Sequence, residues 1–176
     1  MKRVIFLRAL RYYALAVGLT AVAFATGQAI DASGHALVVN TSPSMPSGVY
    51  WITRGTSPLK RGDVVLFAPP DGARELIYGR GWLPRGIPML KTIGGLAGDT
   101  YCVREGRFVV AGADLGPVFV SDSQGLPVPQ LVGCRRVGED EFLPVASTYD
   151  RSFDGRYFGA VSVRNVLGVG RALVTF

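Results

Sequence analysis

The sequence has little of what most hydrolytic and metal sites require. Its 176 residues include one histidine and two cysteines, and only 18% of them are charged. The histidine, His35, follows a glycine in a linker, which disfavours a Ser-His-Asp triad. One histidine and two cysteines do not supply the four ligands of a structural zinc site. We therefore expect neither a metal nor another cofactor.

The excess of positive charge is confined to the amino terminus. The net charge is +6, but four basic residues lie in positions 2–11, before the first acidic residue, Asp31. Beyond residue 30, 15 basic residues face 13 acidic ones. This remainder has no basic patch interleaved with aromatic residues, the pattern typical of nucleic-acid binding. We expect no nucleic-acid partner.

A long uncharged segment follows these basic residues. Residues 12–30 carry no charge, and a helix of that length spans the ~30 Å hydrocarbon core of a bilayer. Basic residues on its amino side place the N-terminus in the cytoplasm and export the rest. A cleaved signal peptide is the alternative, because Ala23-Phe24-Ala25 is an A-x-A site. The basic residues are Lys2, Arg3, Arg8 and Arg11.

These features predict a chain of two parts. Residues 1–30 form a basic cytoplasmic end and an inner-membrane anchor, with the lipid bilayer as partner, and residues 31–176 form a periplasmic domain. Cys102 and Cys134 both lie in the exported part, where oxidation is favoured, so we expect a disulfide. Closing that loop stabilises the fold by ~3 kcal/mol.

Beyond a polar hinge at residues 31–35, short apolar runs alternate with turn residues. No long amphipathic helix is indicated there, and Glu75–Tyr78 fits either a helical turn or a surface loop. Short runs at close spacing predict a mainly β, antiparallel, barrel-like domain. The expected strands are 36–39, 49–53, 64–67, 89–93, 101–103, 108–110, 142–145, 161–163, 166–169 and 173–176, with a further candidate at 118–120.

Ser44 is the candidate nucleophile. Pro43 and Pro46 fix the backbone on either side of it, and Gly48 releases the turn before an apolar strand. A hydroxyl on a stiff loop suits a nucleophile that is positioned ahead of its substrate. An ordinary Pro/Ser turn that leads into a strand is the alternative.

Lys91 is the candidate base. It interrupts an apolar stretch, and strand alternation places it on the same face as Met89 and Ile93. Apolar surroundings lower the pKa of a lysine, which allows the amine to accept the proton of a serine. Lys60 lies in a polar turn and is expected to be solvated. The alternative for Lys91 is an edge-strand lysine that blocks aggregation.

Four segments, in order, resemble the successive boxes of type I signal peptidases. They are Ser42–Met45, Arg61–Phe67, Leu90–Asp99 and Ser152–Gly159. These enzymes are membrane-anchored Ser-Lys proteases of mostly β fold. The stretch Asn40–Tyr50 is similar to the conjugative-transfer (TraF-type) branch, which processes pilin subunits.

The resemblance implies a role for each matched residue. Ser44 is the nucleophile and Lys91 its general base. The Ser42 hydroxyl helps the Ser44 backbone N–H hold the oxyanion, a contribution typically worth ~3 kcal/mol of barrier. Ser152 hydrogen-bonds the Lys91 amine. Two further residues form an ion pair that orients Lys91, although the sequence alone fits an ordinary turn salt bridge equally well. These two are Asp154 and Arg156.

Three departures separate the chain from the housekeeping enzymes. Ser147–Asp150 stands where those enzymes carry Gly-Asp-Asn, Ala97 replaces a usual proline, and Gly155 replaces a usual serine. The Ser-Lys centre is left intact. The departures favour the specialised branch over a general secretory role.

The resemblance therefore implies a serine endopeptidase that processes a secreted, pilin-like precursor in conjugative transfer or type IV secretion. In some relatives of this branch the pilin's own amino terminus resolves the acyl-enzyme and gives a cyclic product. The alternatives are a housekeeping-type signal peptidase I and a non-catalytic scaffold of an envelope complex. A scaffold has no need of a lysine on an apolar strand face.

Overall fold

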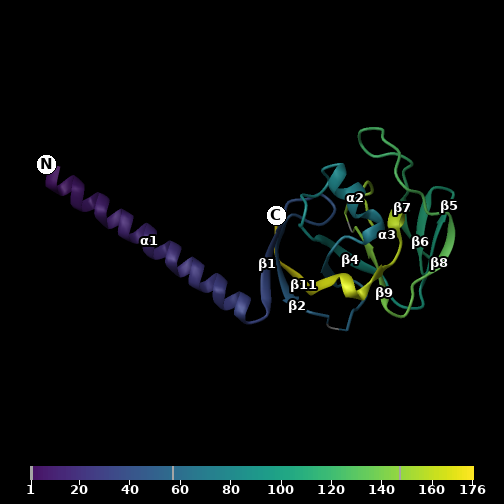
Figure 1. Ribbon diagram of the computed structural model, residues 1–176, viewed down its shortest axis with the longest axis horizontal. Helices are drawn as coiled ribbons and strands as arrows, with labels where there is room; N and C mark the ends of the chain where they lie inside the picture. Colours follow the sequence, from purple (N-terminus) through teal and green to yellow (C-terminus); the bar gives the residue numbers. More distant parts are fainter. Residues whose placement is uncertain (1, 57, 147) are drawn as a thin grey trace. The chain divides into compact units, whose positions relative to one another are not determined.

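The computed structural model describes residues 2–56, 58–146 and 148–176. The chain divides into two compact units, Met1–Ala36 and Leu37–Phe176. Figure 1 traces the elements of each unit in chain order. Of the stretch that departs from the housekeeping pattern, Ser147 lies outside the described residues.

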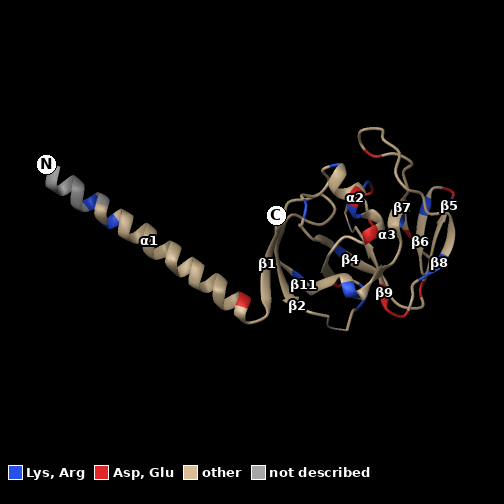
Figure 2. Ribbon diagram, viewed as in Figure 1, with Lys and Arg blue, Asp and Glu red and all other residues tan. Residues whose placement is uncertain are grey.

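Helix α1, Lys2–Ala32, makes up most of the first unit. Its segment Leu10–Ala32 is 23 residues long, apolar enough to cross a membrane, and 0% buried. Figure 2 shows no charged residue between Arg11 and Asp31. A helix of this length with exposed apolar side chains is compatible with a single-pass membrane anchor.

A seven-stranded sheet forms the body of the second unit. Its strand order is β1-β2-β11-β3-β4-β9-β10, and the pairings from β2 to β10 are antiparallel. The mainly β, antiparallel fold is thus confirmed. The barrel-like closure is wrong, because β1 and the very short β10 remain as separate edges. The strands are β1 His35–Asn40, β2 Gly48–Arg54, β3 Val64–Phe67, β4 Met89–Gly95, β9 Glu141–Val145, β10 Val161–Ser162 and β11 Val166–Thr175.

A second sheet of four strands has the order β7-β6-β5-β8. Cys102 on β5 stands directly opposite Cys134 on β8, and the two are joined as a disulfide in the structure. Both cysteines lie outside the cavity described below. The strands are β5 Thr100–Arg104, β6 Arg107–Val110, β7 Ala113–Pro117 and β8 Gly133–Arg136.

Strand β9 connects the two apolar cores of this unit. Its Phe142 packs in a cluster with Val65 and Phe67 of β3. Leu143 and Val145 belong to the other cluster, which the four-stranded sheet also lines. The strand is therefore covered on both faces, and the chain after it becomes buried again at Ser152.

Three short helices complete the unit. Helix α2, Asp71–Gly79, follows Pro70 and carries Asp71 in its first turn, two signals that favour a helix N-terminus. The ambiguous stretch Glu75–Tyr78 is therefore helical. The other two are α3 Gly155–Phe158 and the 3₁₀ helix η1 Val163–Asn165.

The strand predictions differ from the structure in four places. Residues 118–120 form no strand, β7 and β8 were missed, and residues 166–175 form one strand instead of two. Strand β8 consists of exposed, largely polar residues, so only its pairing with β5 reveals it. In β11, Gly170 stays paired with Ile52 of β2, and a Cβ at this position would clash with the Trp51 carbonyl oxygen. The glycine permits close approach of β2.

Candidate active site

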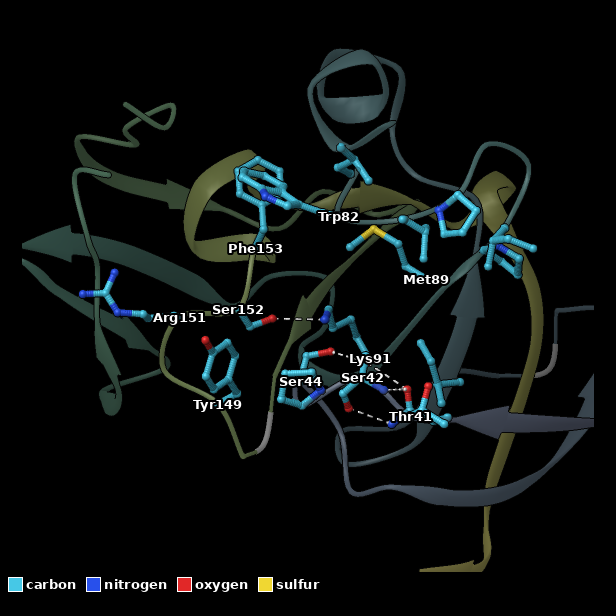
Figure 3. A pocket seen from close by; sticks show the side chains of 18 of the residues that line it. Thr41, Ser42, Ser44, Trp82, Met89, Lys91, Tyr149, Arg151, Ser152 and Phe153 are labelled. Atoms are coloured by element: carbon cyan, nitrogen blue, oxygen red, sulfur yellow. Dashed lines mark hydrogen bonds between the residues drawn. The ribbon is translucent and has the colours of Figure 1, made fainter. Parts of the chain in front are cut away.

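A cavity of about 830 Å³ lies in the second unit. It is lined by the end of β1, the loop that follows it, strand β4, and the segment between β9 and α3. Ser42, Ser44, Lys91 and Ser152 all line this one cavity, and Figure 3 shows them close together in the same view. The fold thus collects residues that lie more than one hundred positions apart in the sequence.

Asn40 organises the loop that carries Ser44, and its role was not predicted from the sequence. Its Nδ2 donates to the carbonyl oxygens of Ser42, Met45 and Pro46 at 3.0, 3.0 and 3.2 Å. Its Oδ1 accepts from the Ser42 N–H at 3.2 Å and from the Ser42 hydroxyl at 2.9 Å. A short amide side chain ahead of a Pro/Ser turn is the signal that could have identified it.

Ser44 is buried at the base of this loop, with 9% of its surface exposed. Its Oγ lies 3.1 Å from the Ser42 Oγ. Because the Ser42 hydroxyl already donates to Asn40, the hydrogen of the Ser42–Ser44 contact comes from Ser44. The loop is also tied to the segment after β9, since Thr148 Oγ1 donates to the Pro43 carbonyl at 3.1 Å.

Lys91 lies in the middle of β4, between β3 and β9, and only 5% of it is exposed. Its neighbours along the same face, Met89 and Ile93, are buried as well. The amine donates to the Ser152 Oγ at 3.0 Å. Burial lowers the pKa of Lys91 from 10.5 to about 8; Asp154 opposes this effect and Arg156 adds to it. The amine is thus brought close to the range in which a base works at neutral pH.

Asp154 and Arg156 form an ion pair of 2.9 Å behind the cavity wall, with 0% and 1% of their side chains exposed. Asp154 also accepts from the Ala146 N–H at 2.7 Å. Arg156 Nη1 donates to the carbonyls of Pro117 and Asp150, both at 3.0 Å. The pair therefore fastens the segment that carries Ser152, and its contact with Lys91 is electrostatic.

Among the described residues, no hydrogen bond joins Ser44 to Lys91. Each hydroxyl or amine is held by another partner, Ser42 for Ser44 and Ser152 for Lys91. Transfer of the Ser44 proton to Lys91 thus requires Ser44 to turn away from Ser42. Rotation of one cavity-facing serine side chain between rotamers is a small conformational change.

The wall of the cavity beyond the polar groups is apolar. Trp82 and Phe153 pack with ring centroids 4.8 Å apart, and Figure 3 shows them with Met89 on the far side of the Lys91 amine from the serine loop. No cluster of three or more metal-ligating side chains occurs among the residues that the structure describes. His35 lies outside the cavity lining, and its Nδ1 is 3.0 Å from the Ser33 hydroxyl.

Comparison with known proteins identifies the family. The model of the family described as signal peptidase, peptidase S26, matches residues 9–175. The match covers nearly the whole chain, so the protein belongs to this signal peptidase family. The resemblance seen in the sequence is confirmed.

Individual relatives fall into two groups. The chain is 30% identical over 169 residues to the plasmid transfer protein TraF of Escherichia coli, covering 88% of this chain and 94% of that protein. Identity to the signal peptidase I of Leptolyngbya laminosa is 27% over 120 residues, covering 68% of this chain and 54% of that protein. A crystal structure of a signal peptidase I from Enterococcus faecalis matches with a TM-score of 0.38 at 21% identity, covering 65% of this chain and 98% of that one.

Proposed function

We propose that the protein is a membrane-anchored serine endopeptidase in which Ser44 is the nucleophile and Lys91 the general base. The observation that carries this proposal is a buried lysine, with its pKa lowered to about 8, in the same cavity as a serine on a rigid loop. Membership of the signal peptidase family supports a peptidase role and a secreted precursor as substrate.

The reaction follows from the hydrogen bonds of the free site. When a peptide carbonyl enters the cavity, Ser44 turns from Ser42 and passes its proton to the neutral Lys91 amine as its Oγ bonds to the carbonyl carbon. The Ser44 backbone N–H and the Ser42 hydroxyl then donate to the oxyanion. For this, Ser42 exchanges its acceptor on Asn40 for the oxyanion.

The second half of the reaction returns the proton. The Lys91 ammonium protonates the leaving amine as the peptide C–N bond breaks, and Ser44 is left as an ester. Throughout, Ser152 keeps the Lys91 nitrogen in place. Either water or an amine then attacks the ester carbonyl and gives a proton to the neutral Lys91 amine, which passes a proton to the Ser44 Oγ as the ester bond breaks. An attacking amine from the precursor's own N-terminus gives a cyclic product.

A secreted, pilin-like precursor of a conjugative transfer system is the substrate we propose. The TraF relative of E. coli, named a plasmid transfer protein, matches over 94% of its length, whereas the signal peptidase I relative matches over 54%. Residues 37–40 of the edge strand β1 line the cavity, so an extended precursor can add its backbone to that edge. The apolar wall suits small apolar side chains.

We further propose that α1 is retained as a single-pass anchor of the inner membrane. Its apolar segment is long enough to span the bilayer, and basic residues precede it. The positive-inside rule then places Leu37–Phe176 in the periplasm.

The test is co-expression of candidate pilin precursors with the wild type, Ser44→Ala and Lys91→Ala, with the products weighed by mass spectrometry. Processing is expected only with the wild type, and a product lighter by one water than the linear processed form shows ring closure. The controls are Ser33→Ala and Lys60→Ala, two exposed residues outside the cavity. Full processing by a folded Ser44→Ala or Lys91→Ala variant would instead identify a scaffold.

A further inference from the structure

Arg151 projects from a rigid turn next to the proposed dyad. The turn is closed by the Ser152 N–H, which donates to the Tyr149 carbonyl at 3.1 Å. The buried Arg156 holds the Asp150 carbonyl at 3.0 Å. Arg151 therefore directly precedes the residue that binds the Lys91 amine, and its backbone is fixed by the same segment. Its side chain lines the cavity and is exposed.

The guanidinium of Arg151 rests on an aromatic ring. Its Cζ lies 4.1 Å from the centroid of the Phe119 ring, within the range of a cation–π contact. Phe119 is itself held, since its N–H donates to the Tyr157 hydroxyl at 3.2 Å. The stacked face leaves the N–H groups at the edge of the guanidinium available to a further partner.

No carboxylate pairs with Arg151 among the described residues. The nearby acids are engaged elsewhere: Asp122, which also lines the cavity, binds Arg80 at 2.7 Å. Asp150 directs its carboxylate toward Gly116, where a Cβ would lie 3.0 Å from the Asp150 Oδ1. The cavity thus contains a fixed, accessible cation that the protein does not neutralise.

We propose that Arg151 binds a carboxylate of the substrate on the leaving-group side of the cleaved bond. This inference rests on the proposed peptidase function. Figure 3 shows Tyr149 and Arg151 on the opposite side of Ser44 from Thr41, the residue that follows β1. A precursor whose acyl part pairs with β1 therefore carries its leaving segment past Arg151. The carboxylate belongs either to an acidic side chain of that segment or to a free C-terminus.

The experiment measures cleavage of matched synthetic peptides by the full-length chain in detergent. Each peptide has small apolar residues before the cleaved bond and Glu or Gln at one of the positions after it, with a free or an amidated C-terminus. The wild type is expected to cleave the carboxylate form with a kcat/KM on the order of fivefold higher, as for one accessible ion pair. The Glu/Gln and free/amidated arms distinguish the two sources of the carboxylate.

Three variants make the assignment specific. Arg151→Gln should remove the preference, Arg151→Glu should transfer it to peptides with Lys at the same position, and Arg135→Gln should keep it. Arg135 is an exposed arginine on β8, outside the cavity. The preference should also weaken as salt is raised from low to physiological ionic strength. Equal cleavage of the acid and amide peptides by the wild type would overturn the proposal while leaving the peptidase intact.

Binding to Ser44→Ala, measured by fluorescence anisotropy of the same peptides, separates this proposal from the peptidase function. Carboxylate-selective binding that Arg151→Gln abolishes supports the Arg151 site. If this binding is found but no peptide is cleaved in a Ser44-dependent manner, only the peptidase function is overturned. The absence of both cleavage and selective binding would overturn both.

Discussion

At the scale of single residues, the chemistry depends on how few partners Lys91 has. Its amine is removed from water, donates to one neutral hydroxyl at 3.0 Å, and has no carboxylate in direct contact among the described residues. Desolvation disfavours the charged form of the amine, and a neutral partner does not restore it. Asp154 affects the Lys91 amine only electrostatically, from behind the cavity wall. This balance raises the fraction of the amine that is neutral at a given pH, as the proposed base requires.

The rate should therefore rise with pH through the pKa of Lys91. The protonated amine cannot take the Ser44 proton, so kcat/KM is expected to fall about tenfold per pH unit well below pH 8. A profile of kcat/KM from pH 6 to 9.5 checks this, with Lys60→Ala expected to superimpose on the wild type. A flat profile would exclude Lys91 as the base.

Lys91 should also limit stability at neutral pH. The pKa of its amine falls from 10.5, the ordinary value of a lysine, to about 8 in the folded protein, so between these values the unfolded chain binds more protons. The contribution of Lys91 to the free energy of unfolding consequently rises between about pH 8 and pH 10.5 and is lowest below pH 8. Lys91→Met should be more stable than the wild type by about 3 kcal/mol at pH 7. Urea unfolding at pH 7 and pH 10 should show that difference shrinking.

Asn40 should be required for the reactivity of Ser44. Asn40→Ala removes five hydrogen bonds within the serine loop, so labelling of Ser44 by a fluorophosphonate should slow at least about tenfold, and stability should fall by about 2 kcal/mol. Asn165→Ala is the matched control, because it removes one amide donor, to Ala68, away from the cavity. An unchanged labelling rate in folded Asn40→Ala would show that the loop is rigid without it.

At the scale of elements, the buried ion pair joins parts that the two sheets do not hold together. Asp154 accepts a hydrogen bond from the Ala146 N–H, directly after β9. Arg156 on α3 donates to the carbonyl of Pro117, the last residue of β7. The Ser152 segment has no sheet pairing of its own and depends on these contacts. The pair thus acts as a structural support for the hydroxyl that binds Lys91.

Breaking this pair should affect both stability and activity. Asp154→Asn leaves a buried guanidinium without its counter-charge, so it should destabilise the fold by about 3 kcal/mol and reduce processing. The double variant Asp154→Asn, Arg156→Met should cost less than the sum of the two single changes, as measured by urea unfolding. Arg85→Met, which removes an exposed pair with Glu75, should change stability by at most about 0.5 kcal/mol. Additive single effects would contradict the coupling.

At the scale of the whole molecule, the proposed anchor and the proposed active site lie in different units. The cavity is lined entirely by residues of Leu37–Phe176. The helix contributes a segment of 23 residues that is apolar enough to span a bilayer. The proposed reaction and the proposed attachment therefore depend on different stretches of the chain.

The full-length chain should consequently behave as an integral membrane protein. It is expected to remain in the membrane pellet after carbonate extraction, and alkaline phosphatase fused after Phe176 should be active in the periplasm. Val17→Arg with Leu19→Arg places two charges inside the span and should weaken insertion, since each costs about 3 kcal/mol at the bilayer centre. A mature protein whose mass corresponds to cleavage after Ala25 would reveal a cleaved signal peptide in place of the anchor.

Features that depend on neighbouring residues in the chain could be predicted from the sequence. The uncharged segment 12–30 indicated the long apolar helix α1, the alternation around Lys91 indicated its apolar environment, and most strands followed from short apolar runs. Strand β8 and the continuity of β11 could not be predicted, because they follow from pairing with β5 and β2. The open edges of the sheet were likewise decided by which strands find no partner.

Composition and spacing made Ser44 and Lys91 candidates, since only one lysine lies within an apolar strand, but their roles as a dyad were implied by the resemblance to the signal peptidases. The hydrogen bond from Lys91 to Ser152 was implied only by that resemblance, and the roles of Asn40 and Arg151 were not predicted. The bond from Lys91 to Ser152 spans 61 positions, the clamp of Asn40 depends on how the loop turns back on it, and the unpaired state of Arg151 depends on where every neighbouring acid points. Local features are determined by residues that are adjacent in the sequence, whereas hydrogen bonds between distant residues exist only after the strands have paired and brought those residues together.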